Sequence, residues 1–370
     1  MSSRIAEWSL FATTVLVTLV VALLVLRWLA PGLLGLPVDL QIVQVDERVV
    51  PFFDNVFRGE DRSSDEFILK DPRTVVRGHP FYARADKVGP TDLLGFRNHS
   101  VPRQADVITI GDSQTAGVGV PINASWPQQL QGLLGNTATV YNMSVGGWGA
   151  VQYLDMWSKA QVFKPGTVII AFYPGNDPRE SFRDAYSIEH WAFLRPDAEL
   201  GMDDMLPVHY PIPRDELWGV SFSDGSTTVL TPQLRLASNL DHPTIATGWE
   251  IMAQVAEQVA KEASELGIEP IFIIIPTKER AYARRIEHER AGDNREYLQL
   301  VTAEQRYSAK LAERIEDAGA IYVDVFTPIS QAVFNGRVQV YPHSFDGHLR
   351  RTGHTIIARA VLHIVRTALE

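Results

Sequence analysis

The sequence predicts an α/β protein built on a doubly wound, mainly parallel sheet of five strands, preceded by one transmembrane helix. Two observations predict the sheet. Five short apolar segments alternate with segments of helical periodicity, and they are apolar throughout, as strands covered on both faces are. A third observation, a long uncharged stretch near the amino terminus, predicts the transmembrane helix. The five expected strands span residues 107–110, 137–141, 168–173, 271–275 and 321–325.

The uncharged stretch runs from Trp8 to Leu26 and consists mostly of Leu, Val, Ala and Thr. At a rise of about 1.5 Å per residue, the segment from Trp8 to Trp28 spans about 30 Å, the thickness of a hydrocarbon core. Both tryptophans then lie where an aromatic belt forms. We expect residues 1–30 to be a single-pass anchor that crosses the membrane through residues 8–28. A cleaved signal peptide fits less well, because its apolar core is usually shorter.

The orientation of this anchor is less strongly encoded. Arg4 and Arg27 lie on opposite sides of the stretch, so the positive-inside rule is nearly balanced. We expect the amino terminus in the cytoplasm, which places the body of the protein outside, in the periplasm or at the cell surface. Prolines and glycines then break the helix, so residues 31–104 should form a stalk and entry segment before the sheet-bearing domain at residues 105–370.

Composition excludes several classes of partner. The formal net charge of -10 argues against a nucleic-acid partner, which needs a basic face. The chain has no cysteine, which excludes disulfides and cysteine-ligated zinc. No cluster of side chains has the spacing of a metal site, and we expect neither a metal nor a cofactor.

Cap and turn signals place the helices between the strands. Residues 125–128 have a capping-box pattern with an early proline, and Gly135 should end that helix. A second capping-box pattern at residues 302–305 should start a helix that runs to about Asp317. The last helix is expected over about residues 352–368.

One long insertion interrupts the alternation of strands and helices. It covers about residues 178–247, is rich in proline, aspartate and aromatic residues, and contains Asp224-Gly225, which predicts a hairpin. Since the insertion leaves the sheet at the carboxyl end of the third strand, it should form a lid or side wall beside a site there.

Chemistry-bearing residues gather in the loops after the strands, where open α/β sheets bind their ligands. A nucleophilic serine needs a base, a carboxylate that orients the base, and donors for the oxyanion. Ser113 fits the nucleophile, His348 the base and Asp346 the orienting carboxylate. The backbone N–H groups of Ser113 and Gly147 and the side-chain amide of Asn176 fit the oxyanion hole. Taken singly, each of these segments is also compatible with an ordinary turn.

Together, these segments resemble the SGNH hydrolase family, a branch of the GDSL esterases and lipases. The matching segments, in the family's order, are Gly111-Asp112-Ser113, the glycine-rich stretch 142–149, Gly175-Asn176-Asp177, and Asp346-Gly347-His348 followed by Gly353. The resemblance covers about residues 92–370 and implies a flavodoxin-like α/β/α sandwich. The sequence departs from the family in two places: only Gly347 separates Asp346 from His348, and Pro174 stands where a glycine is common.

The resemblance implies a membrane-anchored serine esterase that cleaves O-acyl esters through an acyl-serine, with O-acetyl on a cell-envelope carbohydrate as the expected substrate. An O-acetyltransferase of the envelope polysaccharide machinery is an alternative, because only the acceptor of the acyl group differs. A non-catalytic glycan-binding or assembly subunit is a second alternative. It fits less well, since a binding module has no need for Ser113, Asn176 and His348 together.

Other polar residues near these segments have structural interpretations. Asp112 should serve its turn, Asp177 should cap or brace its loop, and His354 should pack or cap at the start of the last helix. The charged run at residues 278–285 is expected to be a solvated face, with contact to an anionic glycan as the alternative.

Overall fold

The computed structural model describes residues 14–15, 17–22, 25, 68–80, 82, 89–207, 213–232 and 241–370. The chain divides into two units, Met1–Val50 and Pro51–Glu370. The predicted anchor at residues 8–28 lies mostly outside the described residues, and those described within it are helical. Among the described residues, none of the helices combines the length and the apolar composition that a membrane crossing requires.

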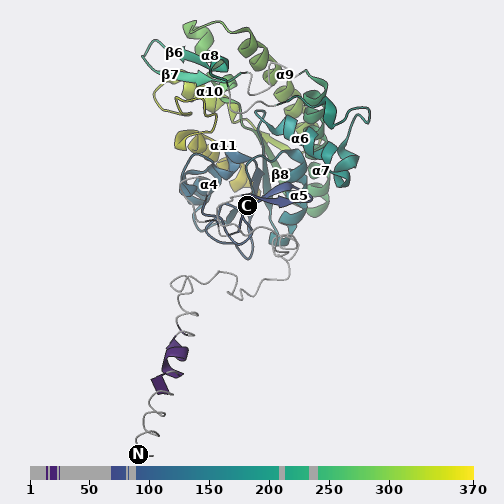
Figure 1. The fold of residues 1–370 in the computed structure, drawn as a ribbon, viewed down its shortest axis with the longest axis vertical. Coiled ribbons are helices and arrows are strands. Elements are labelled where there is room, and N and C mark those ends of the chain that lie inside the picture. The colour runs from purple at the N-terminus through teal and green to yellow at the C-terminus, as the bar shows by residue number, and fades with distance from the viewer. Residues whose placement is uncertain are drawn as a thin grey trace, which may run out of the picture. The chain divides into compact units, whose positions relative to one another are not determined.

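The larger unit contains the predicted five-stranded parallel sheet (Figure 1). Its strands are β3 (Val107–Gly111), β4 (Val140–Asn142), β5 (Thr167–Phe172), β8 (Glu269–Ile274) and β9 (Ile321–Val323). They lie side by side in the order β4-β3-β5-β8-β9, and every neighbouring pair is parallel. In chain order this is 2-1-3-4-5, the flavodoxin-like doubly wound arrangement. The expectation for the sheet is therefore confirmed.

One face of the sheet packs against α4 (Trp126–Leu134), α10 (Phe326–Asn335) and α11 (Arg351–Leu369). Val107, Ile169 and Ile271 share one buried cluster with Leu130 of α4 and Ile357 of α11. Successive side chains of a strand point to opposite faces, so alternate residues of β5, Ile169 and Ala171, and of β8, Ile271 and Ile273, belong to this cluster. Figure 1 shows α4 and α11 beside each other, as their mutual packing requires.

The opposite face carries α5 (Ala150–Ala160) and α7 (Pro243–Leu266), with α6 (Asp177–Ser187) packed along α7. Phe172 of β5 stacks on Phe272 of β8, with ring centroids 5.9 Å apart. Tyr153 of α5 covers Phe172, with centroids 5.8 Å apart. Burial on both faces explains why β3, β4, β5 and β8 read as apolar runs rather than alternating ones, and the edge strand β9 is half-buried.

The remaining elements connect or extend this sandwich. Two antiparallel hairpins, β1–β2 and β6–β7, lie outside the main sheet, and the second confirms the turn predicted at Asp224-Gly225. The other elements are β1 (Ile68–Asp71), β2 (Val75–Gly78), α3 (Ser113–Ala116), β6 (Trp218–Ser221), β7 (Thr227–Leu230), α8 (Lys278–Glu289), α9 (Arg295–Asp317) and short 3-10 helices at Ile122–Ala124, Gln161–Phe163, Glu189–Leu194, Met202–Asp204 and Arg214–Glu216.

The first capping-box prediction is right about where the helix begins and wrong about the side-chain cap, and the second is wrong about where the helix begins. Ser125 precedes α4, which ends at Gly135 as expected, but its hydroxyl donates to Ile122 O at 2.8 Å instead of capping the helix. The helix expected to start at Thr302 begins at Arg295, because Asn294 caps it by accepting the Tyr297 N–H at 3.0 Å. In both cases a competing local acceptor or cap lay outside the four-residue pattern.

Candidate active site

Ser113 lies at the junction between β3 and α3, at the carboxyl end of the sheet. Strand β3 pairs with β4 on one side and β5 on the other, so Ser113 follows the strand at which the chain order reverses. The turn is tight: a Cβ at Gly111 would lie 2.3 Å from Thr115 Oγ1. A glycine is therefore required at the end of β3, and the serine hydroxyl emerges outside the sheet, half-buried.

The three predicted triad residues are in contact in series, with His348 in the middle. Ser113 Oγ lies 3.0 Å from His348 Nε2, and His348 Nδ1 lies 2.7 Å from Asp346 Oδ1. A carboxylate at Nδ1 favours the tautomer with the proton on Nδ1, which leaves Nε2 free to accept the serine proton. The side chains of His348 and Asp346 are 30% and 46% exposed, so a ligand can reach them from solvent.

The short spacing between Asp346 and His348 does not prevent this contact. Asp346 Oδ1 accepts the backbone N–H of His348 at 3.0 Å as well as the ring Nδ1. One carboxylate oxygen therefore fixes both the backbone and the ring of the histidine. With one intervening residue, Gly347, the loop closes on itself as a compact turn.

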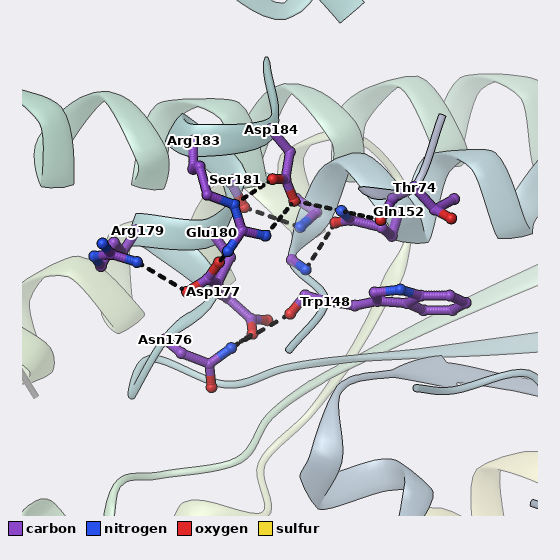
Figure 2. A network of polar contacts seen from close by, with 12 residues as sticks. Thr74, Trp148, Gln152, Asn176, Asp177, Arg179, Glu180, Ser181, Arg183 and Asp184 are labelled. Carbon is purple, nitrogen blue, oxygen red and sulfur yellow. Dashed lines mark hydrogen bonds and ion pairs between the residues drawn. The ribbon is translucent and has the colours of Figure 1, made fainter. Parts of the chain in front are cut away.

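The segments that carry the predicted oxyanion donors meet beside Ser113. A Cβ at Gly146 would lie 3.4 Å from Ser113 Cβ, so the glycine-rich loop passes next to the serine. Gly147 follows with a φ of 82°, in the left-handed region that favours glycine. The Asn176 amide reaches this loop and donates to Trp148 O at 3.3 Å, as Figure 2 shows. Ser113, Gly147 and Asn176 thus belong to three loops at one edge of the sheet.

Asn176 stands at the start of α6 without capping it through its side chain. Its second bond, to Asp177 Oδ1, is also 3.3 Å long. Hydrogen bonds of this length are weak, so the amide can leave them and donate to a developing oxyanion at a small cost in free energy. The glycine that precedes it is required sterically, because a Cβ at Gly175 would lie 2.3 Å from the ring of Tyr173. The glycine thus stands at position 175, after Pro174, and Asn176 still reaches the glycine-rich loop.

A polar network fixes the loop that holds Gly147 (Figure 2). Gln152, in the first turn of α5, donates to Thr74 O at 3.1 Å and to the Asp184 carboxylate. The indole N–H of Trp148 donates to Val76 O at 2.8 Å. The β1–β2 hairpin, which lies in the predicted entry segment, is thereby tied to the glycine-rich loop and to α6. Nothing in the sequence of the hairpin indicated this contact.

Asp112 is buried directly behind the nucleophile. It caps α3, as expected for a turn residue, by accepting the Gln114 N–H at 2.9 Å. Its other oxygen lies 3.2 Å from Ser113 Oγ, so the serine hydroxyl has two possible acceptors, Asp112 and His348. Burial raises the pKa of Asp112 to about 6, against smaller lowering contributions from the Gln114 N–H and from His348.

Asp177 is the second buried carboxyl near the site and braces its loop, as predicted. Its Oδ2 accepts the Tyr173 N–H at 2.8 Å and the Tyr153 hydroxyl at 2.9 Å. Burial raises the pKa of Asp177 well above its usual range, and the nearby charge of Asp112 raises it further. The two carboxyls disfavour each other's ionisation, which is the situation expected where two acids share a site of low polarity.

The charged run after β8 is a solvated face only in part: Arg284 is exposed, but the interpretation is wrong for Lys278, Glu279 and Arg285, which are buried. Lys278 and Glu279 are each 1% exposed, because α8 begins beneath the loop that carries Asp346 and His348 (the triad loop) and not on the surface. Lys278 Nζ donates to three backbone carbonyls, those of Val229 at 3.0 Å, Pro342 at 2.7 Å and Ser344 at 2.6 Å.

The β6–β7 hairpin of the insertion also contacts the triad loop. The Val229 N–H of β7 donates to His343 O at 3.0 Å, and His343 Nδ1 lies 2.6 Å from Thr227 O. Figure 1 shows this hairpin beside α8, and Arg285 of α8 lies over the Phe222 ring at 4.0 Å. Part of the predicted insertion therefore supports the segment that leads into Asp346 and His348.

Two further buried side chains hold the nucleophile segment. His354 Nδ1 accepts the Trp126 N–H at 3.3 Å, and burial lowers the pKa of His354 to about 3, which keeps it a neutral acceptor. His354 therefore packs in the interior, as expected, and its ring caps α4 instead of its own helix α11. Arg97, from the entry segment, donates to Ala116 O at 3.1 Å and to Val120 O at 2.6 Å, and burial lowers its pKa to about 10. The polypeptide after α3 is thus anchored on both sides.

Comparisons with known proteins give structural likenesses only. No protein-family profile matches the chain, and no curated protein matches it either. Similar solved structures include a G-D-S-L family protein from Desulfitobacterium hafniense described as lipolytic, with a TM-score of 0.39, 13% identity, and 70% of this chain and 98% of that chain covered. A catalytic mutant of Axe2, an acetylxylan esterase from Geobacillus stearothermophilus, gives a TM-score of 0.41 at 13% identity, with 72% of this chain and 95% of that chain covered. TesA gives a TM-score of 0.37 at 14% identity, with 71% of this chain and 98% of that chain covered.

These scores and identities are too low to assign the chain to a family or a substrate. The chemistry available at the site is therefore judged from its own side chains. Within the described part of the chain, no group of three His, Asp or Glu side chains is arranged to hold a metal ion. What the site does contain is a serine hydroxyl, an imidazole and a carboxylate in hydrogen-bonded series, with amide donors on the adjacent loops.

Proposed function

We propose that this protein is a serine ester hydrolase that cleaves O-acyl esters through an acyl-Ser113 intermediate. The observation that carries the proposal is the series of contacts from Ser113 Oγ to His348 Nε2 at 3.0 Å and from His348 Nδ1 to Asp346 at 2.7 Å. A nucleophile, a base and an orienting carboxylate within hydrogen-bond reach are the requirements for activating a hydroxyl. A protein that only binds a glycan would not need this series.

In the first step, Ser113 Oγ attacks the carbonyl carbon of the ester, and its proton passes to His348 Nε2. Asp346 stabilises the imidazolium that forms. The oxyanion of the tetrahedral intermediate receives hydrogen bonds from the backbone N–H groups of Ser113 and Gly147 and from the Asn176 amide. When the intermediate collapses, His348 returns the proton to the leaving alkoxide. Water then attacks the acyl-serine with His348 again as the base, which releases the acid.

We propose further that the acyl group is an acetyl on a cell-envelope carbohydrate and that the protein is held at the membrane by residues 8–28. The resemblance of the sequence to the SGNH hydrolases and the uncharged stretch after Trp8 support this choice. The catalytic domain would then act outside the cytoplasm, on polysaccharide or on small esters. A transferase would use the same residues and the same acyl-serine, with a sugar hydroxyl in place of water.

The test is labelling of the purified full-length protein with a fluorophosphonate, followed by mass spectrometry of the labelled peptide and by hydrolysis of an aryl acetate. We expect the label on Ser113 and loss of nearly all activity in Ser113→Ala and in His348→Ala. The double variant should be barely slower than either single one, because the residues act as one unit. Asp346→Asn should also be severely impaired, since the ring loses the acceptor that sets its tautomer.

Matched controls come from the same chain. Ser158→Ala removes a hydroxyl that donates to Asp155 O on α5, and His363→Ala removes a histidine of α11, both away from the triad. Both should keep full activity. A folded Ser113→Ala protein with activity close to wild type would refute the covalent mechanism. Release of free acetate from an acetylated glycan supports the hydrolase, and transfer to an added glycan with little free acetate supports the transferase.

A further inference from the structure

The side chain next to the nucleophile bridges to both sides of the catalytic histidine. Gln114 Nε2 donates to Gly347 O at 3.1 Å, and Gln114 Oε1 accepts the Leu349 N–H at 3.2 Å. Gly347 and Leu349 are the residues immediately before and after His348. The carboxamide of Gln114 therefore spans the backbone at His348 across a separation of more than two hundred residues in the chain.

This bridge is built into the same short helix as the nucleophile. Ser113 and Gln114 are the first two residues of α3, and Asp112 fixes the start of that helix by accepting the Gln114 N–H at 2.9 Å. Ser113 contacts the histidine ring, while Gln114 holds the histidine backbone. A displacement of α3 would consequently carry the triad loop with it, and the distance from Ser113 Oγ to His348 Nε2 would be preserved.

We propose that Gln114 is a positioning residue that holds the Asp346–His348 loop in register with Ser113. This inference rests on the proposed function, since it concerns the geometry of the same triad. Gln114 is 2% exposed, and Leu349 is 1% exposed. Buried backbone groups need partners, and water cannot replace the carboxamide at this depth.

The carboxamide is the side chain that this position requires. The bridge needs one donor for a carbonyl and one acceptor for an N–H at the same time, and glutamine supplies both at its end. Methionine has a similar length and supplies neither of them effectively. Glutamate keeps the acceptor for Leu349 but presents a negatively charged oxygen to the Gly347 carbonyl. Gln114→Met therefore removes both bonds, whereas Gln114→Glu keeps the bond to Leu349 and replaces the bond to Gly347 with a repulsive contact.

The chain offers a matched control in Gln131 of α4. Its Nε2 donates to Gly135 O at 2.8 Å and Ala138 O at 3.0 Å, and its Oε1 accepts the Val140 N–H at 2.7 Å. Gln131 thus also bridges two backbone segments with both ends of its amide, but it does so at the end of α4, away from the triad. Gln131 is half-buried, so Gln131→Met should destabilise the protein somewhat less than Gln114→Met, and it should not move His348.

The experiment compares the full-length wild type with Gln114→Met, Gln114→Glu and Gln131→Met. For each protein we would measure kcat and KM on an aryl acetate, the thermal midpoint, and the hydrogen-exchange rate of peptides that contain Leu349. We expect Gln114→Met to lower kcat between about tenfold and a hundredfold with little change in KM, because small misplacement of a catalytic group has effects of this size. Exchange at Leu349 should accelerate in Gln114→Met, and less in Gln114→Glu.

A merely structural role predicts a different pattern. If Gln131→Met lowers kcat as much as Gln114→Met at a similar loss of thermal midpoint, the positioning role is refuted. A folded Gln114→Met protein with unchanged kcat also refutes it. If wild type is neither labelled by fluorophosphonate nor active on any ester, the proposed function fails instead. The exchange rates at Leu349 then still test whether Gln114 holds the loop.

Discussion

The buried carboxyl behind the nucleophile allows a prediction about stability and pH. Asp112 is fully buried, and burial raises its pKa from the ordinary value of 3.8 to about 6. Between these two values the folded state binds the proton of Asp112 more tightly than the unfolded state does. Stability therefore falls as the pH rises through this window, and the full penalty is present above pH 6.

The size of the effect follows from the shift. At about 1.36 kcal/mol for each pKa unit, the raised pKa of Asp112 corresponds to about 3 kcal/mol, of which about 2 kcal/mol should develop between pH 4 and pH 7. The substitution Asp112→Asn removes the titration. It can keep the acceptor that Gln114 N–H uses at 2.9 Å, so α3 stays capped. Relative to wild type, the variant should therefore gain about 2 kcal/mol in unfolding free energy when the pH is raised from 4 to 7.

The assay is urea unfolding of both proteins at pH 4, 5, 6 and 7, followed by circular dichroism and by tryptophan fluorescence. Agreement of the two signals checks that a two-state free energy is meaningful. The prediction concerns how the difference in unfolding free energy between variant and wild type changes with pH. A destabilisation by the substitution that is the same at all pH values therefore does not affect it. Parallel curves of unfolding free energy against pH for wild type and variant would refute the reasoning.

Three other predictions follow from the site and its supports. Asn176→Ala should lower kcat by about a hundredfold or more at nearly constant KM, as for loss of one oxyanion donor; a raised KM with unchanged kcat would make it a substrate-binding residue. Lys278→Met should lower the unfolding free energy by about 3 kcal/mol, because three buried carbonyls lose their donor, and should lower kcat; an unchanged urea midpoint would contradict this. Removal of residues 1–40 should release the protein from membranes with activity retained, and a truncated protein that still pellets after a carbonate wash would contradict the anchor.

The amino-acid sequence by itself determined the strands and the order of the site loops. Each strand is a local signal, since a segment buried on both faces must be apolar throughout. In a parallel sheet the carboxyl ends of all strands lie at one edge, so residues after different strands are brought together without any knowledge of their contacts. This is why Ser113 and Asn176 could be grouped from the strand pattern, whereas Asp346 and His348 follow α10 and were placed by the resemblance.

What only the tertiary structure decided is which groups satisfy one another across the chain. Gln114 carried no signal of its own, Lys278 looked like part of a solvated face, and residues 302–305 looked like the start of a helix. Each depends on a partner far away or just outside the pattern: the backbone around His348, the carbonyls of the triad loop, and the cap at Asn294. A buried polar group must be paired, but the sequence around it does not encode the partner, because the fold supplies it.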